Sequence, residues 1–308
     1  MVYVLLILGF ACLIKGADFF VDGCSGLARK FHVPTIIIGL TVVAMGTSLP
    51  ELAISVSAAI RGIDGMAVSN IIGSNIFNLL MVCGCCAAAA PLTVQAESLK
   101  KQMPFTILIT VLLLGLGVRG MSIGRTDGLI LLAIFVCFLW TTVRKAKKSM
   151  DEIETEEDTG FTWWKCLLCL AGGGAAIAVG GQLVVSSAEE IAAGFGLSET
   201  LIGLTVCAIG TSLPELVTSM VATRKGEDDM AFGNVIGSCL FNILMILGIT
   251  SAIRPMEFLT ENIMDLLILI AFSAAILLMM FPKKRLNRGC GICCIGLYAV
   301  YMVYICIR

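Results

Sequence analysis

The chain has 308 residues, of which 58% are hydrophobic and 14% charged, and its mean hydropathy is +0.98. Average soluble domains are roughly 45–50% apolar and about 25% charged, so this composition excludes a soluble domain. At about 20 residues per crossing, the length accommodates about ten membrane-spanning helices. The formal net charge of -1 conceals an uneven distribution of charge along the chain.

Ten apolar runs, each bounded by charged residues, Gly or Pro, predict ten transmembrane helices. In chain order they cover residues 2–27, 35–60, 66–90, 103–118, 126–143, 163–188, 200–223, 230–252, 262–281 and 290–307. The loops after odd-numbered helices hold 14 Lys and Arg, and the remaining loops with the C-terminus hold 5. Because cytoplasmic loops are enriched in both residues, we expect a multi-pass protein of the inner or plasma membrane with both termini outside the cytoplasm.

The longest hydrophilic stretch covers residues 144–162, and it is basic at first and acidic between Asp151 and Asp158. A run of like charges is normally solvated, so we interpret this stretch as a cytoplasmic linker between two halves. A regulatory divalent-ion site in its acidic part is the alternative.

An internal repeat divides the chain. Residues 39–84 align with 203–248 without a gap, and 27 of the 46 positions are identical, including a Gly-Thr-Ser-Leu-Pro-Glu segment in each copy. Each half, 1–143 and 163–308, contains five predicted spans, and this odd number makes the second half enter the membrane from the opposite side. The sequence therefore predicts an all-α polytopic membrane protein whose ten transmembrane helices form two inverted five-helix repeats. This arrangement is typical of secondary transporters, whose substrates bind near the membrane midplane.

Each repeat places one glutamate, Glu51 or Glu215, near the middle of the membrane. A carboxylate at that depth costs roughly 2.5–3.5 kcal/mol on insertion scales. No Lys or Arg lies at the matching depth of the second, third, seventh or eighth span. The compensating cation is therefore expected to come from solution.

Oxygen-bearing side chains share helical faces with these glutamates. At intervals of four residues they are Thr47 and Ser55; Asn70, Ser74 and Asn78; Thr211 and Ser219; and Asn234, Ser238 and Asn242. Pro50 and Pro214 should break their helices and free the carbonyl groups of residues 44–46 and 208–210. Such hard oxygen ligands suit Ca²⁺ or Na⁺.

The paired Gly-Thr-Ser-Leu-Pro-Glu segments, each followed by Asn-x-Ile-Gly-Ser-x-x-x-Asn, resemble the two alpha-repeats of the cation/Ca²⁺ exchanger superfamily, specifically of prokaryotic sodium/calcium exchangers. The resemblance implies that Glu51 and Glu215 bind Ca²⁺ and share the Na⁺ sites. The further ligands that it implies are Ala44, Thr47, Ser48, Ser74, Asn78, Ala208, Thr211, Ser212, Ser238 and Asn242. In some relatives the position of Asn242 is acidic, and the asparagine here argues against K⁺ co-transport.

The first and sixth helices lie outside this four-helix core, and the resemblance implies that they slide as a gate. Within the first helix, Lys15 and Asp18 lie one turn apart and are expected to form an ion pair. A role along the ion path is the alternative.

These features favour an antiporter that exchanges Na⁺ for Ca²⁺ by alternating access, with no catalytic residues, no cofactor, no nucleic-acid partner and the lipid bilayer as its surroundings. Protons are expected to compete for the same carboxylates. The alternative is Ca²⁺/H⁺ exchange, although relatives of that type usually carry Gly-Asn in place of Gly-Thr-Ser. An intramembrane protease would use two carboxylates as acid and base, but the chain lacks a Gly-x-Gly-Asp motif. A passive channel would need an open pore.

Overall fold

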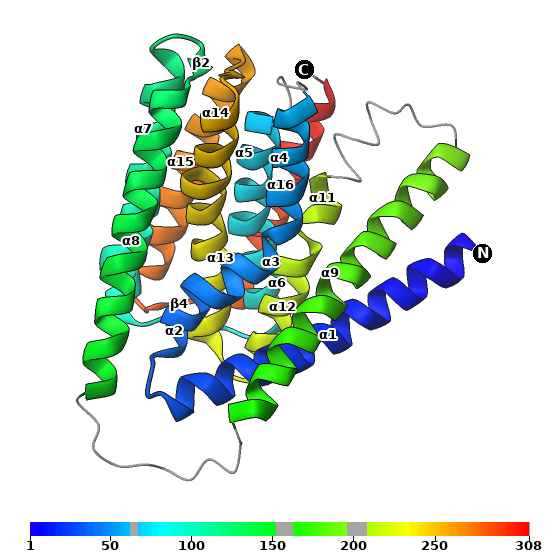
Figure 1. The fold of residues 1–308 in the computed structure, drawn as a ribbon, viewed down its shortest axis with the longest axis vertical. Coiled ribbons are helices and arrows are strands. Elements are labelled where there is room, and N and C mark those ends of the chain that lie inside the picture. The colour runs from blue at the N-terminus through cyan, green and yellow to red at the C-terminus, as the bar shows by residue number, and fades with distance from the viewer. Residues whose placement is uncertain (62–66, 152–162, 196–207, 308) are drawn as a thin grey trace.

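The computed structural model describes residues 1–61, 67–151, 163–195 and 208–307, and helices dominate this part of the chain (Figure 1). Eight of its helices are long and apolar enough to cross a membrane, or nine if one bent pair counts as a span. The eight are built from α1 (Val2–Lys30); α5 (Ala67–Ile76), η2 (Phe77–Val82) and α6 (Cys83–Ala89); η3 (Ser98–Gln102) and α7 (Met103–Val118); α8 (Arg125–Asp151); α9 (Trp163–Gly194); α13 (Asp228–Phe241), η5 (Asn242–Ile246) and α14 (Leu247–Ile253); α15 (Thr260–Met280); and α16 (Arg288–Ile307).

The bent pair is interrupted at Ser48. Before the break lie α2 (Thr35–Ile38), η1 (Gly39–Val43) and α3 (Ala44–Thr47), and after it α4 (Leu49–Arg61) continues at an angle of 44°. Pro50 lacks the N–H that would bond to the carbonyl of Gly46, so a regular helix cannot pass through this turn. In the other half, Ser212 interrupts α11 (Ala208–Thr211) and α12 (Leu213–Arg224) before Pro214. The breaks expected from both prolines are confirmed.

The two halves share their local backbone as well as their sequence. A shift of 164 residues carries α3 onto α11, η2 onto η5 and α6 onto α14, with only small differences in their bounds. The wide π-helical turns of η2 and η5 therefore recur at the same place in each half.

Two short antiparallel sheets each join one strand from either half. Strand β1 (Leu92–Thr93) pairs with β4 (Arg285–Leu286), and β2 (Ser122–Ile123) pairs with β3 (Met256–Glu257). In Figure 1, β2 lies at the top of the bundle and β4 lower down. The sheets thus connect the halves at separate places.

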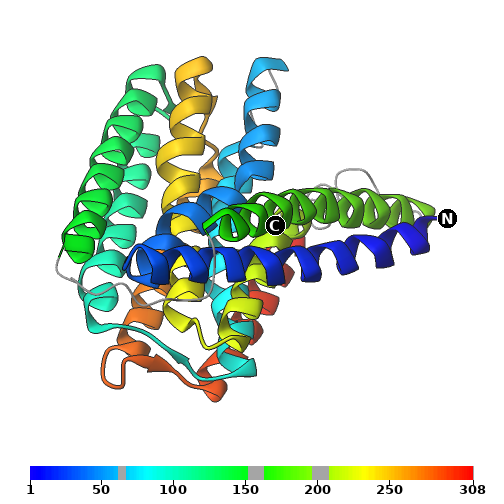
Figure 2. The same ribbon diagram turned by 60° about the horizontal axis from the view of Figure 1, so that its bottom comes forward.

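Helices α1 and α9 lie side by side and run obliquely across the bundle (Figures 1 and 2). Glycines let their backbones touch: a Cβ atom added to Gly173 would lie 2.7 Å from the carbonyl oxygen of Gly16, and one added to Gly180 would lie 2.8 Å from that of Gly9. The shift of 164 residues relates Gly9 to Gly173 and Gly16 to Gly180. We call these four glycines the glycine seam between α1 and α9. The same backbone contact occurs in it twice.

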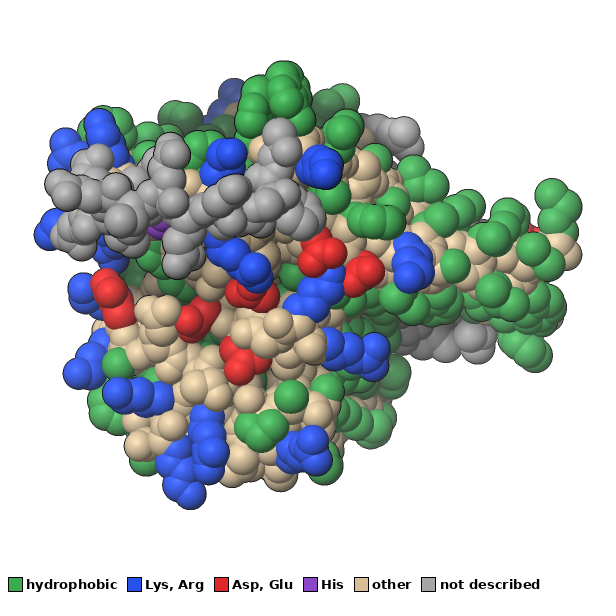
Figure 3. Space-filling model, turned by 90° about the horizontal axis from the view of Figure 1, so that it is seen from below, with side chains coloured by type: hydrophobic (Ala, Val, Ile, Leu, Met, Phe, Trp, Pro, Cys, Tyr) green, Lys and Arg blue, Asp and Glu red, His purple; other side chains and the backbone are tan. Residues whose placement is uncertain are grey.

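The centre of the bundle is formed by the spans Val68–Ala89 and Asp228–Ile253, whose most apolar windows are 78% buried, against 22–33% for the other six. The outer helices expose large apolar side chains, among them Ile7, Leu168, Leu278 and Val300. Figure 3 shows charged side chains gathered on one end of the bundle, whereas the arm made by α1 and α9 is mostly apolar. A multi-pass membrane protein has this distribution.

Helix α8 continues to Asp151 and so enters the stretch that the sequence predicts as a linker from residue 144. The rest of that stretch from residue 152, with the acidic residues up to Asp158, lies outside the described residues. So do residues 203–207, the start of the second repeat motif.

Candidate ion site

The two helix breaks meet in the centre of the bundle and bring both glutamates to one place. Glu51 and Glu215 lie in the first turns of α4 and α12, and neither is exposed at all. Ser48 donates a hydrogen bond of 2.7 Å from Oγ to Oε1 of Glu215, and Ser212 donates one of 3.4 Å from Oγ to Oε1 of Glu51. Each serine thus binds the glutamate of the opposite half.

The helix starts at α4 and α12 also favour negative charge at these positions. The first N–H groups of a helix lack intrahelical acceptors, and the helix dipole places partial positive charge there. Because Glu51 and Glu215 occupy the first turn after each break, the sequence that breaks the helix also provides an electrostatically suitable place for the carboxylate.

Several buried oxygens of the residues predicted as ligands have no hydrogen-bonding partner among the described residues. They are Oε2 of Glu51 and of Glu215, Oγ of Ser74 and of Ser238, and Oδ1 of Asn78 and of Asn242. Buried polar atoms are normally satisfied, and each exception needs an explanation such as an ion or a water molecule. Carboxylate, hydroxyl and amide oxygens are the ligands that Ca²⁺ accepts. The donor set therefore fits a hard cation.

The packing of the helices brings these atoms towards the same region. Helix α13, which carries Ser238, packs against α3, and η2, which carries Asn78, packs against α12. Helix α11, which begins at Ala208 and ends at Thr211, packs against α5. The elements that carry the predicted ligands are thus in mutual contact.

Two predicted ligands, Thr47 and Ala44, belong to a hydrogen-bonded network. Oγ1 of Thr47 lies 3.1 Å from the carbonyl oxygen of Val43, 3.3 Å from that of Ala44 and 3.2 Å from Oδ1 of Asn234. The carbonyl of Ala44 also accepts the N–H of Ser48 at 3.1 Å. Asn234 donates from Nδ2 to Ser219 at 2.9 Å. In this conformation the Ala44 carbonyl is therefore already engaged.

Asn75 lies in this region and is not among the ligands predicted from the sequence. Its Nδ2 donates to the carbonyl of Cys239 at 3.3 Å, and its Oδ1 accepts from Nδ2 of Asn242 at 3.0 Å. This second bond holds the NH₂ group of Asn242, so that the amide oxygen is directed elsewhere. The sequence does distinguish this position, because Asn75 in the first repeat corresponds to Cys239 in the second.

The unequal lengths of the crossed hydrogen bonds predict unequal effects of removing the two serine hydroxyls. If these oxygens hold Ca²⁺, Ser48→Ala should weaken its binding about tenfold or more, since a hydrogen bond to a charged group contributes roughly 1.5–3 kcal/mol. Ser212→Ala removes the longer bond and should weaken binding less. Isothermal titration of both purified variants with Ca²⁺ measures the difference. Equal losses of Ca²⁺ affinity in the two variants would contradict the difference expected from the two hydrogen-bond lengths.

Comparison with known proteins gives matches along nearly the whole chain. The family model described as sodium/calcium exchanger protein matches residues 1–144 and 165–307. The antiporter CaxA of Alkalimonas amylolytica is 40% identical over 92% of this chain and 91% of its own length. Sodium/calcium exchanger MaX1 of Methanosarcina acetivorans is 28% identical over 98% of this chain and 97% of its own.

Solved structures of the sodium-calcium exchanger NCX_Mj resemble this fold. One of them superposes with a TM-score of 0.86 at 30% sequence identity, covering 98% of this chain and 97% of its own. The same fold is therefore present over almost the full length of both chains.

Proposed function

Because the chain belongs to the sodium/calcium exchanger protein family, we propose that it exchanges Na⁺ for Ca²⁺ across the membrane by alternating access. The family makes it a cation/Ca²⁺ antiporter in a membrane, and family membership implies a transporter rather than a catalyst. We propose in addition that Na⁺ is the driving ion, and we propose the residues that bind the ions.

The observation that carries the proposal is the pair of fully buried glutamates that accept crossed hydrogen bonds from Ser48 and Ser212, together with predicted ligand oxygens that have no partner within the described part of the chain. Two carboxylates balance the charge of one Ca²⁺, and the same oxygens can hold Na⁺ ions instead, so the two ions compete. The full proposed ligand set is Ala44, Thr47, Ser48, Glu51, Ser74, Asn78, Ala208, Thr211, Ser212, Glu215, Ser238 and Asn242.

We propose ten spans in two inverted repeats, and the pairing of the short strands supports this number. Strand β1 follows the third span and β4 the ninth, and paired strands must lie on the same side of the membrane. An even number of crossings must then separate them. The number of crossings between β1 and β4 is even only when the segment that contains α11 and α12 counts as a span. The same count holds for β2 and β3.

The basic loops place β1 and β4, the linker and the start of α2 on the cytoplasmic side in this proposal, and both termini on the other side. In that topology α1 and α9 cross the membrane beside the ion site and slide as a gate. Their glycine seam suits this role, because small residues let helices pack closely in a membrane.

An ion-pair contact ties α1 to the core at the proposed cytoplasmic end. Nζ of Lys225 lies 2.6 Å from Oδ1 of Asp18 and 2.7 Å from Oδ1 of Asp22, and it donates to the carbonyl of Asp18 at 2.8 Å. The partner of Asp18 is therefore Lys225 of the other half, and the ion pair with Lys15 expected from helical spacing is wrong. Spacing along one helix could not reveal a partner 207 residues away.

Removing the charge of Lys225 should change the relative populations of the conformations in which α1 and α9 take different positions against the core. Lys225→Gln removes both ion pairs, and since partly exposed pairs contribute about 0.2–1 kcal/mol each, exchange rates should change several-fold rather than vanish. Arg224→Gln, a loss of the same charge at the neighbouring residue, should leave the rates unchanged. Initial rates of Ca²⁺ uptake at several NaCl concentrations measure this, and equal rates for both variants would contradict a role for the contact.

The decisive experiment is Ca²⁺ uptake into proteoliposomes that contain the purified protein. An outward Na⁺ gradient should drive uptake, and an outward H⁺ gradient without Na⁺ should not. Uptake driven by the H⁺ gradient alone would favour Ca²⁺/H⁺ exchange and overturn Na⁺ as the coupled ion. Uptake without any gradient that runs to equilibrium at channel-like rates would overturn antiport itself.

A further inference from the structure

An amphipathic cavity lies away from the ion site, between α7, α8 and the beginning of the bent helix. Its volume is about 470 Å³, within the range of roughly 300–1,000 Å³ typical of ligand sites. On α8 its wall includes a stripe with a four-residue period, formed by Ala133, Cys137, Thr141 and Lys145. The side chains of this stripe are exposed, so the cavity opens towards the outside of the bundle.

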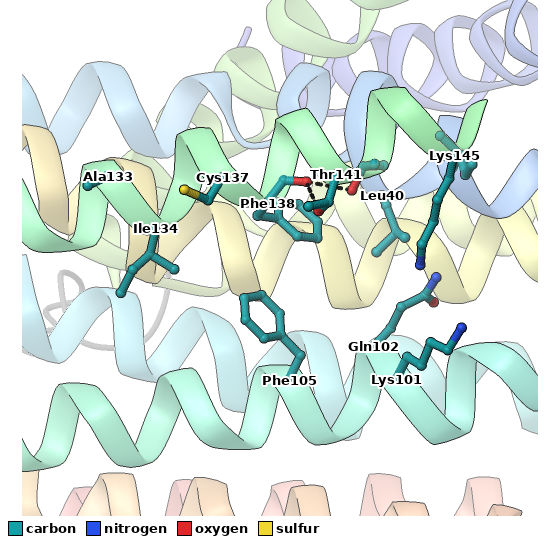
Figure 4. A pocket seen from close by; sticks show the side chains of 12 residues that line it. Leu40, Lys101, Gln102, Phe105, Ala133, Ile134, Cys137, Phe138, Thr141 and Lys145 are labelled. Atoms are coloured by element: carbon teal, nitrogen blue, oxygen red, sulfur yellow. Dashed lines mark hydrogen bonds between the residues drawn. The ribbon is translucent and has the colours of Figure 1, made fainter. Parts of the chain in front are cut away.

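The two ends of this cavity differ in chemistry (Figure 4). Ala133, Ile134, Phe138 and Phe105 form its apolar part, and the rings of Phe105 and Phe138 stack with their centroids 5.8 Å apart. Leu40 lies nearer to the other end. Lys101, Gln102 and Lys145 gather at the other end. A ligand that fills the cavity must therefore be apolar along most of its length and polar at one end.

A second, more polar cavity adjoins the basic end. It has a volume of about 300 Å³ and shares Ile37, Gln102 and Lys145 with the first. Ser98 and Lys148 are among its other wall residues. Together the two cavities suit a ligand that has an apolar chain and a large polar head group.

Among the described residues that line the two cavities, the charged ones are Lys101, Lys145, Lys148 and Glu97. Nζ of Lys101 lies 2.8 Å from Oε1 of Glu97, and Nζ of Lys145 lies 3.5 Å from the same oxygen. One carboxylate thus serves two ammonium groups, and Lys148 adds a third basic side chain to the wall of the second cavity. The hydrogen bond from Lys101 lowers the pKa of the Glu97 carboxyl from its ordinary value.

We propose that the joined cavities bind one anionic phospholipid from the surrounding membrane, with an acyl chain in the apolar part and the phosphate between Lys101 and Lys145. Basic pockets between transmembrane helices on the cytoplasmic side are suited to anionic head groups, and lysine binds phosphate as a point charge. Of the two contacts of Glu97, the one with Lys145 is the longer, and in this proposal the phosphate replaces the Glu97 carboxylate there. The proposal does not depend on which ion drives transport.

The position of this site gives the lipid a structural role. Ile37 and Leu40 belong to α2 and η1, the segment that leads directly into α3 and the break at Ser48. An acyl chain against these side chains would support the bent helix from its outer side, on the same helix as Glu51.

Native mass spectrometry of the purified protein with added phosphatidylglycerol or phosphatidylethanolamine tests the proposal. We expect one phosphatidylglycerol to be retained and phosphatidylethanolamine to be lost at lower collision energy. The double variant Lys101→Gln/Lys145→Gln should retain phosphatidylglycerol at least tenfold less. The matched double variant Lys100→Gln/Lys147→Gln loses the same charge from neighbouring residues that line neither cavity, and it should retain the lipid.

Two further variants separate the head group from the acyl chain. Glu97→Gln removes the competing carboxylate and should increase retention, a change opposite in direction to that of the lysine variants. Ala133→Phe fills the apolar part and should lower retention with both lysines in place and the unfolding temperature unchanged. Equal retention of the two lipids, or equal loss in both lysine pairs, would overturn the proposal. Retention unaffected by Ala133→Phe would overturn the acyl-chain site.

Discussion

Glu51→Gln and Glu215→Gln are each expected to weaken Ca²⁺ binding by about two to three and a half powers of ten and to abolish gradient-driven Ca²⁺ uptake. Glutamine keeps the shape of the side chain and can still accept the hydrogen bond from Ser212 or Ser48, so the change is mainly one of charge. Removing one partner of a buried ion pair costs about 3–5 kcal/mol. Each 1.4 kcal/mol corresponds to a tenfold change in affinity, which gives the expected range.

The same variants should be at least as stable as the natural protein when Ca²⁺ is absent, because a neutral amide costs less to bury than a carboxylate. Ca²⁺ should raise the unfolding temperature of the natural protein, by linkage, and fail to do so in the variants. Glu261→Gln at the exposed start of α15 provides the control and should bind Ca²⁺ normally. Variants that unfold at the natural temperature and still bind Ca²⁺ with natural affinity would refute the site.

The double variant sharpens the assignment to a single site. If both carboxylates hold the same ion, the loss caused by Glu51→Gln/Glu215→Gln should be smaller than the sum of the two single losses, because residues that share a partner are not additive. Additive losses would indicate two independent sites.

The sequence predicts the parts of this site that depend on local chemistry. Pro50 and Pro214 remove a helix hydrogen bond wherever they stand, and a duplicated glutamate in an apolar run must have a compensating partner. Both arguments hold without knowledge of neighbouring helices. The breaks at Ser48 and Ser212 and the burial of Glu51 follow from them and are found in the structure.

The remaining features depend on which helices meet. The hydrogen bond from Ser48 to Glu215 and the ion pair between Asp18 and Lys225 join residues of opposite halves, and no spacing along the chain specifies them. The π-helical turns of η2 arise from a shift in backbone hydrogen bonding that the pattern of apolar residues does not record. For the same reason, the amide of Asn75 shows its role only once Asn242 lies beside it.

Gly173→Ala is expected to lower the free energy of unfolding by about 1–3 kcal/mol, the usual cost of overpacking, and to slow exchange. The added Cβ would lie 2.6 Å from the backbone nitrogen of Phe20 and 2.7 Å from the carbonyl oxygen of Gly16. Backbone atoms cannot turn aside as a side chain can, so α1 and α9 must separate. Gly172→Ala is the matched control, because its Cβ would meet nothing within 4 Å.

The repeated geometry of the seam provides a second test of the same contact. Gly180→Ala would place a Cβ 2.7 Å from the backbone nitrogen of Leu13, and it should cause a loss similar to that of Gly173→Ala. The two glycines lie two helical turns apart, about 10 Å, so the losses should add in the double variant. Thermal unfolding in detergent measures the natural protein and the four variants. If Gly172→Ala and Gly173→Ala unfold at the same temperature, the backbone contact does not hold α1 against α9, and the sliding gate loses its structural basis.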